Sequence, residues 1–353
     1  MKTEIAVMEG TDHDKKMIER AGNILRRGGL VAFPTETVYG LGGDALNKES
    51  SRKIYSAKGR PSDNPLIVHI ADMKMLGAIV EEIPETAERL AAEYWPGPLT
   101  MIMNKSAKVP YETTGGLETV AVRMPKHPVA LSLIRAAGGY VAAPSANTSG
   151  KPSPTEARFV KEDMDGRIDM ILDGGMVGIG LESTIIDLTG EVPVILRPGY
   201  ITGEMLEETL KMPVAVDKTL FLEDTGQAPK APGMKYRHYA PQGTLTIISG
   251  EEKKVVARIN ERTEEMHKKG EKVGVIGTEE TAALYTADCV KNAGNRKDEE
   301  TVARELYRIL REFDEEQVTV IYSEAFEDTG LGQAIMNRLI KAAGHHIEYV
   351  DEK

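Results

Sequence analysis

Four cationic side chains that are distant in the sequence indicate a site for an anionic ligand. Lys58 and Arg60 lie in a short turn fixed by glycine and proline, although such a turn could also be a solvated charged loop. Arg197 ends an apolar segment. Arg123 lies within the apolar segment 119–125, so it either faces solvent at a sheet edge or contacts a ligand. Such cations bind phosphate and carboxylate, and each shielded hydrogen bond to a charged group contributes roughly 1.5–3 kcal/mol.

The stretch 142–155 supplies small polar groups that suit the same kind of ligand. Ser145 and Asn147 follow a short apolar run, and Ser153 suits the N-cap of a helix with Pro154 in its first position. A strand end, a polar turn and a helix N-terminus together favour negative charge, because free N–H groups and the helix dipole point toward it. An ordinary loop with good caps is the alternative.

The sequence lacks the motifs of several other common chemistries. It contains neither the phosphate-binding pattern G-x-x-x-x-G-K-[ST] nor the dinucleotide pattern G-x-G-x-x-G, and no H-E-x-x-H zinc motif. A serine–histidine–acid set is not visible either. Cationic, hydroxyl and amide groups can align anions and neutralise developing charge with little acid–base work, as in phosphoryl and nucleotidyl transfer.

Composition limits the class of protein. The chain has 353 residues, which favours two domains, and a formal net charge of −11, which argues against a general nucleic-acid coat. Its single cysteine, Cys289, excludes an internal disulfide. Neither a signal peptide nor an apolar run long enough to span a membrane is apparent. We therefore expect a cytoplasmic protein that does not enter a membrane.

The elements that must position the polar residues fall into two parts, 1–211 and 244–353. In the first part, short apolar strands alternate irregularly with amphipathic helices, for example a helix over 14–29 that stops at Gly28 and Gly29. The glycines at 40, 42 and 43 allow close backbone approach or positive φ. In the second part, strands and helices alternate regularly, which predicts a small parallel, doubly wound α/β domain.

The segment 212–243 differs from both parts because prolines and glycines interrupt it throughout. Its end, Ala231–Pro241, is rich in polar and aromatic side chains. Long irregular segments often act as lids or binding loops, so a lid is one hypothesis and a passive tether the other.

Several motifs, taken in order, resemble one known family, that of the threonylcarbamoyl-AMP synthases in their long two-domain form. The resemblance is dense over about 14–205 and extends through His238-Tyr-Ala-Pro241 to the second domain. It implies a catalytic domain with a twisted mixed sheet, flanking helices and a large positive concavity. The motifs are Pro34-Thr-Glu-Thr-Val-Tyr-Gly-Leu41, Lys58-x-Arg60 with Asn64-Pro-Leu-Ile67, Trp95-Pro-Gly-Pro-Leu-Thr100, Val122-Arg-Met-Pro125, Pro144-Ser-Ala-Asn-Thr-Ser-Gly150, Ser183-Thr-Ile-Ile-Asp187 and Leu196-Arg-Pro-Gly199.

The resemblance also implies a reaction and its partners. L-threonine and bicarbonate would form a carbamate that attacks the α-phosphate of ATP, giving L-threonylcarbamoyl-adenylate and pyrophosphate. Mg²⁺ is expected with ATP, and phosphates and water should supply most of its ligands. The product would pass to downstream proteins that modify tRNA beside the anticodon, and a weak contact with tRNA itself is possible in such a family.

The same resemblance assigns site residues by motif. Residues implied in catalysis and phosphate binding are Lys58, Arg60, Ser145 and Asn147. Further nucleotide contacts would be Asn64, Thr119, Ser153, Arg197 and, from the linker beside His238, Tyr239. L-threonine would be held by Thr37, His69, Arg123, the backbone of Ala143, and Ser183, with Arg123 as the partner of its carboxylate.

Two other functions fit parts of the sequence. A basic concave face could bind double-stranded RNA or tRNA without catalysis, although the acidic net charge disfavours this. Carbamoyl-adenylate chemistry in hydrogenase maturation is a related possibility. It is disfavoured because that branch usually carries zinc-finger cysteines, whereas this chain has one cysteine.

Overall fold

The computed structural model describes residues 2–217, 220, 229–232 and 238–351. Its chain forms two compact units. One comprises Met1–Ser149 with Ser153–Tyr236, and the other comprises Gly150–Pro152 with Arg237–Lys353. The division falls inside the segment 212–243 that the sequence suggests as a linker, and the part of the proposed lid at 233–237 lies outside the described residues.

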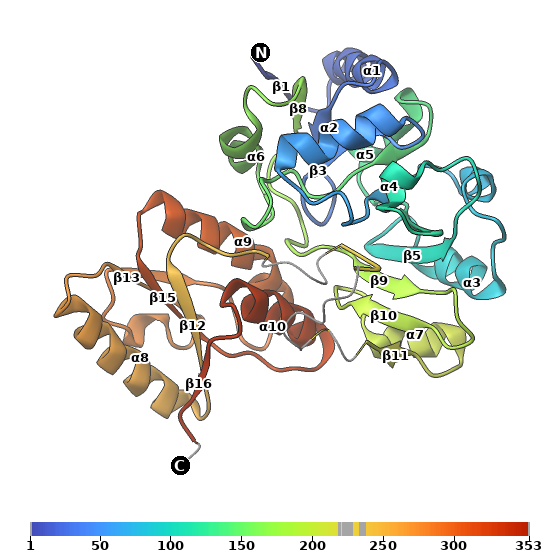
Figure 1. The fold of residues 1–353 in the computed structure, drawn as a ribbon. Helices are drawn as coiled ribbons and strands as arrows, with labels where there is room; N and C mark the ends of the chain where they lie inside the picture. Colours follow the sequence, from blue (N-terminus) through green and yellow to red (C-terminus); the bar gives the residue numbers. More distant parts are fainter. Residues whose placement is uncertain (1, 218–219, 221–228, 233–237, 352–353) are drawn as a thin grey trace. The chain divides into compact units, whose positions relative to one another are not determined.

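The first unit is built on a mixed sheet of eleven strands (Figure 1). Most of its strands are short and buried, so the polar side chains at their ends define the surface available to a ligand. In order across the sheet the strands are β1 (Glu4–Val7), β8 (Met170–Asp173), β2 (Val31–Phe33), β3 (Gly40–Asp44), β7 (Val141–Ala142), β4 (Ile67–His69), β6 (Thr119–Arg123), β5 (Leu99–Asn104), β9 (Thr184–Asp187), β10 (Val194–Arg197) and β11 (Ala215–Val216).

Helices cover the sheet and bury two cores. Alternate residues of a strand face opposite sides, so Ala32 joins one core while Val31 and Phe33 join the other. The helical elements of this unit are α1 (Asp12–Arg26), α2 (Lys48–Lys58), a 3₁₀ helix (Met73–Ala78), α3 (Glu85–Tyr94), α4 (Tyr111–Thr114), α5 (Pro128–Ala136), α6 (Ala157–Met164) and α7 (Gly203–Leu210).

The helix expected over 14–29 is present as α1, with two acidic side chains in its first turn and a buried face at Ala21 and Leu25. Gly28 follows with a φ of 77°, a conformation that favours glycine and ends the helix. The segment 72–80, whose sequence also predicts a helix, contains the 3₁₀ helix Met73–Ala78.

The glycine run at 40–43 forms strand β3 rather than a loop. A Cβ atom at Gly42 would lie 3.0 Å from side-chain carbons of both Phe33 and Val141. Close packing, and not positive φ, is therefore what this position requires.

The helix start expected at Ser153 is wrong, because α6 begins at Ala157 and Glu156 is its N-cap. The Ser153 hydroxyl donates instead to Glu182 Oε1 at 2.5 Å. A charged acceptor 29 positions away in the sequence replaces the local N–H groups that a capping serine would bind.

The second unit confirms the expected parallel, doubly wound domain. Its strand order is β14 (Cys289–Asn292), β13 (Val273–Gly277), β15 (Val320–Glu324), β12 (Thr244–Ser249) and β16 (Ile347–Tyr349), all parallel. Figure 1 shows helix α8 (Glu252–His267) on one face of this sheet, and α9 (Glu299–Glu315) and α10 (Gly330–Ala342) pack against each other. Within the described residues, no helix of either unit is long and apolar enough to cross a membrane.

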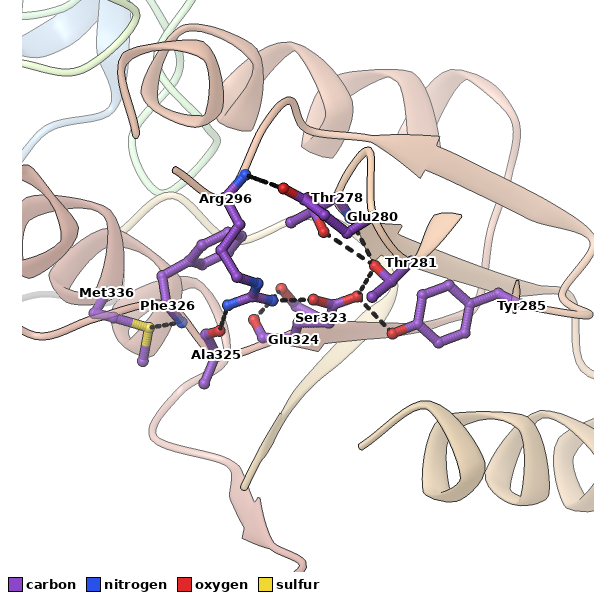
Figure 2. A network of polar contacts seen from close by, with 10 residues as sticks. All are labelled: Thr278, Glu280, Thr281, Tyr285, Arg296, Ser323, Glu324, Ala325, Phe326 and Met336. Carbon is purple, nitrogen blue, oxygen red and sulfur yellow. Dashed lines mark hydrogen bonds and ion pairs between the residues drawn. The ribbon is translucent and has the colours of Figure 1, made fainter. Parts of the chain in front are cut away.

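A polar network lies at the carboxyl end of β15, shown in Figure 2. The connections after β13 and β15 run toward opposite edges of the sheet, and doubly wound domains commonly bind ligands at such a point. Here the buried Glu324 carboxylate receives hydrogen bonds from Thr281 and, at 2.6 Å, from Tyr285, and it pairs with Arg296. Burial and the adjacent carboxylate raise the pKa of Tyr285, so its hydroxyl remains a donor.

Replacing this carboxylate should destabilise the protein. Glu324→Ala leaves the hydroxyls of Thr281 and Tyr285 without their acceptor, and it leaves Arg296 without its acidic partner. The free energy of unfolding of the full chain in urea should fall by about 2–4 kcal/mol. The exposed Glu327→Ala is the control and should change it by less than about 0.5 kcal/mol. Equal stability of the two variants would show that the network contributes little.

Candidate active site

Lys58 joins the end of helix α2 to the polar turn that follows β7. The helix ends because Gly59 adopts a left-handed conformation, with a φ of 62°. The Lys58 ammonium group is buried and donates to the carbonyl oxygens of Ser145 and Asn147, each at 2.5 Å. Its own carbonyl accepts from Ser149 N at 2.8 Å. The structure thus brings three predicted catalytic residues into direct contact.

Arg60 and Asn64 form a second predicted group. Arg60 Nη2 donates to Asn64 Oδ1 at 2.6 Å and to the carbonyl of Pro65 at 3.0 Å, and its Nε donates to the carbonyl of Asn64 at 3.1 Å. The turn between α2 and β4 therefore holds a buried guanidinium group in one orientation. A cation fixed in this way loses little conformational entropy when it binds an anion.

Strand register places several predicted threonine contacts in one row. His69 of β4 lies beside Arg123 of β6, which lies beside Thr100 of β5. Residues paired across neighbouring strands share a face of the sheet. Next to this row, the hydroxyls of Thr100 and Ser183 are 2.7 Å apart. These positions are far apart in the sequence, so their proximity depends on the order of the strands.

Arg123 is buried, so of the two possibilities left open by the sequence, a solvent-facing edge residue is excluded. Its Nη1 donates to Thr37 Oγ1 at 2.9 Å, and its Nε donates to the carbonyl of Gly97 at 3.3 Å. Its Nη2 lies 2.7 Å from Glu36 Oε1 in an ion pair. Sequence reasoning missed Glu36, although an acid directly before Thr37 and a need for a partner to a buried arginine were both visible.

Arg197 ends strand β10, which is separated from β5 of this row by strand β9. Its Nη2 donates to Ser183 Oγ at 3.1 Å, and its Nε donates to the carbonyl of Ser183 at 3.0 Å. A register shift between Ile195 and Arg197 in the pairing of β10 with β9 places Arg197 opposite Ile185. Ser183 thus connects Arg197, which is predicted to contact the nucleotide, with the residues that are predicted to bind L-threonine.

His69 is uncharged at neutral pH. Burial lowers its pKa to about 3, and the positive charge of Arg123 contributes to the shift. Its Nδ1 lies 3.1 Å from the carbonyl oxygen of Ile67. A neutral imidazole can exchange a hydrogen bond with a hydroxyl group without repelling the neighbouring guanidinium group.

Of the remaining predicted residues, Ala143 shares an acceptor with His69, the carbonyl oxygen of Ile67. Thr119 begins β6, four residues before Arg123, and at roughly 3.3 Å per residue it lies near the opposite end of that strand. The amide of Ala143 donates to Ile67 at 2.9 Å, beside β4. Tyr239 belongs to the second unit, where its ring lies 5.2 Å from that of Tyr307, so its nucleotide contact stays a prediction.

The low pKa of His69 predicts a pH dependence of stability. Between about pH 6.5 and 3 the unfolded chain binds a proton at His69 that the folded protein does not, so stability falls as pH falls through this range. The loss at His69 approaches about 1.4 kcal/mol per pH unit. Urea unfolding of His69→Gln at pH 6.5, 5.5 and 4.5 should therefore show a smaller decline than wild type. The exposed His13→Gln should keep the wild-type slope, and equal slopes in all three proteins would contradict the prediction.

Comparisons with known proteins support one family. Residues 23–199 match the domain family described as "Telomere recombination", and residues 201–344 match the C-terminal domain of threonylcarbamoyl-AMP synthase. The chain is 51% identical to the threonylcarbamoyl-AMP synthase of Bacillus subtilis over 98% of this chain and 99% of that protein. It is 49% identical to that of Pyrococcus abyssi over 94% and 95%.

A solved structure supports the same family. The crystal structure of P. abyssi Sua5 complexed with L-threonine has a TM-score of 0.92 and 46% identity, and the match covers 99% of this chain and all of that chain (100%). Both domains, their order and almost the full length agree with these relatives. The chain belongs to the threonylcarbamoyl-AMP synthase family.

Proposed function

We propose that this protein makes L-threonylcarbamoyl-adenylate from L-threonine, bicarbonate and ATP. The amine and bicarbonate give a carbamate and water, and a carbamate oxygen then attacks the α-phosphate while pyrophosphate leaves. The observation that carries the proposal is the contact chain from Arg123 through Thr100 and Ser183 to Arg197, which joins the residues assigned to the two substrates. The family membership of the whole chain supports it.

L-threonine fits the row formed by β4, β6 and β5. A relative has been solved with L-threonine bound. Arg123 supplies a buried positive charge for the carboxylate, and the hydroxyls of Thr37 and Ser183 lie beside Arg123 and Arg197, respectively. The neutral His69 would serve the threonine hydroxyl, since neither group changes charge at neutral pH.

ATP would bind to Lys58 and Arg60, the two buried cations that lie outside that row. Lys58 and Arg60 are buried in orientations fixed by backbone carbonyl groups. Because their positions are set in advance, they can stabilise charge that develops on the α-phosphate without reorganising. Ser145 and Asn147, which bind Lys58 through their carbonyls, would place the phosphates and ribose beside it.

Mg²⁺ would accompany ATP and offset phosphate charge. Among the residues that the structure describes, no group of three histidine, cysteine or acidic side chains is arranged to ligate a metal. Phosphate oxygens and water would therefore supply most of its ligands. The product would be delivered to proteins that transfer the threonylcarbamoyl group to tRNA in the cytoplasm. A binding module without catalysis is not favoured by relatives named as synthases.

The proposed reaction predicts a strict substrate requirement. With ATP and Mg²⁺, pyrophosphate release should require L-threonine and bicarbonate together, because the nucleophile is their carbamate. Mass spectrometry should find threonylcarbamoyl-adenylate, with one labelled carbon when ¹³C-bicarbonate is used. Equal pyrophosphate release in the absence of L-threonine would rule out the proposed reaction.

The two cations assigned to phosphate should be needed for turnover. Lys58→Ala and Arg60→Ala each remove a positioned charge, so kcat/KM for ATP should fall about 10²–10³-fold. Circular dichroism should confirm that both variants fold. Lys48→Ala, an exposed lysine at the start of the same helix, is the matched control and should keep wild-type activity. Wild-type turnover in both site variants would refute the assigned roles.

A further inference from the structure

Glu36 is a buried acid in a site otherwise built from cations and hydroxyl groups. It lies between Thr35 and Thr37, in the segment that follows strand β2, and its side chain is only 13% exposed. Both of its carboxylate oxygens are buried, and within the described residues neither receives a hydrogen bond. It forms an ion pair with Arg123, whose Nη2 also has no hydrogen-bond partner among those residues.

The contact between these two side chains is an ion pair whose geometry is not that of a hydrogen bond. Oε1 and Nη2 are 2.7 Å apart, yet each atom remains without a hydrogen bond. Leaving a buried charged group in this state is costly, and native structures rarely tolerate it outside functional sites. The ion pair therefore leaves Glu36 able to accept a well-aligned hydrogen bond from a ligand and Arg123 able to donate one.

His127 is the other titratable group whose charge interacts with Glu36. Burial lowers the pKa of His127, while the negative charge of Glu36 opposes that shift. Its Nδ1 makes no hydrogen bond within the described residues. His127 therefore does not supply the donor that Glu36 lacks.

We propose that Glu36 binds the ammonium group of L-threonine while Arg123 binds its carboxylate. This inference rests on the proposed function. A free α-amino acid carries both charges on one carbon, so an adjacent acid and arginine can pair with both at once. The neutral zwitterion would give each buried group the hydrogen bond that it lacks without changing the net charge of the site.

This contact would also position the reacting nitrogen. After the ammonium group has lost its proton to solvent and reacted with bicarbonate, the carbamate nitrogen still carries one hydrogen. That N–H can donate to Glu36, so the carboxylate can hold the same atom before and after the carbamate forms. Glu36 is thus a positioning residue that selects amino acids over hydroxy acids.

The test compares L-threonine with (R)-3-hydroxybutyrate, which lacks only the amino group. Calorimetry on the full chain should show that wild type prefers L-threonine. Glu36→Gln keeps the size of the side chain and removes its charge, so affinity for L-threonine should fall at least about 20-fold while affinity for (R)-3-hydroxybutyrate changes less than about threefold. Glu36→Asp retains the charge and should recover part of the preference. The exposed Glu81→Gln should bind both ligands as wild type does.

Two results would overturn the proposal. One is that Glu36→Gln binds L-threonine as tightly as wild type. The other is that it loses affinity for both ligands equally, which would mean that Glu36 only holds Arg123 in place. If the analogue binds neither protein measurably, failure of Glu36→Asp to recover L-threonine binding also overturns it. The proposed function fails separately, when wild type forms no threonylcarbamoyl-adenylate from ATP, bicarbonate and L-threonine.

Discussion

Buried positive charge is the constraint on which the site depends. Lys58, Arg60, Arg123 and Arg197 are each at most 9% exposed, so each must find acceptors inside the protein. Backbone carbonyls supply many of them, and a carbonyl orients a cation without cancelling its charge. The surrounding fold must therefore deliver carbonyl groups at fixed points, which strand ends and tight turns do. The acceptors include carbonyls of Asn64, Gly97, Ser145 and Ser183.

The two substrates differ in charge, and the site reflects that difference. ATP is strongly anionic, and Lys58 and Arg60 are held through neutral carbonyl and amide oxygens. L-threonine is a zwitterion, and Arg123 lies beside an acid. A second acid, Glu182, accepts a hydrogen bond from Ser153.

The sequence predicted local features well, because caps, glycine stops and apolar runs act over a few residues. Helix α1 lies close to where the pattern placed it. Sheet order could not be predicted, since β4 pairs with β6 and β7 through contacts between distant segments. Ser153 was misread for the same reason: its hydroxyl donates to a carboxylate that is distant in the sequence, and the helix begins only at Ala157. Glu36 was missed although an acid before Thr37 was visible, because its pairing with Arg123 is a contact between segments distant in the sequence.

The second unit includes three residues of the segment between Asn147 and Ser153, two residues that are predicted to bind the nucleotide. Gly150–Pro152 belongs to that unit, although Asn147 and Ser153 on either side belong to the first. There the buried Arg311 of α9 donates to the Pro152 carbonyl from Nε at 3.0 Å and from Nη2 at 2.7 Å, and the amide of Ala240 donates to Gly150 at 2.9 Å. The conformation of these three residues is therefore set by α9 and the end of the linker.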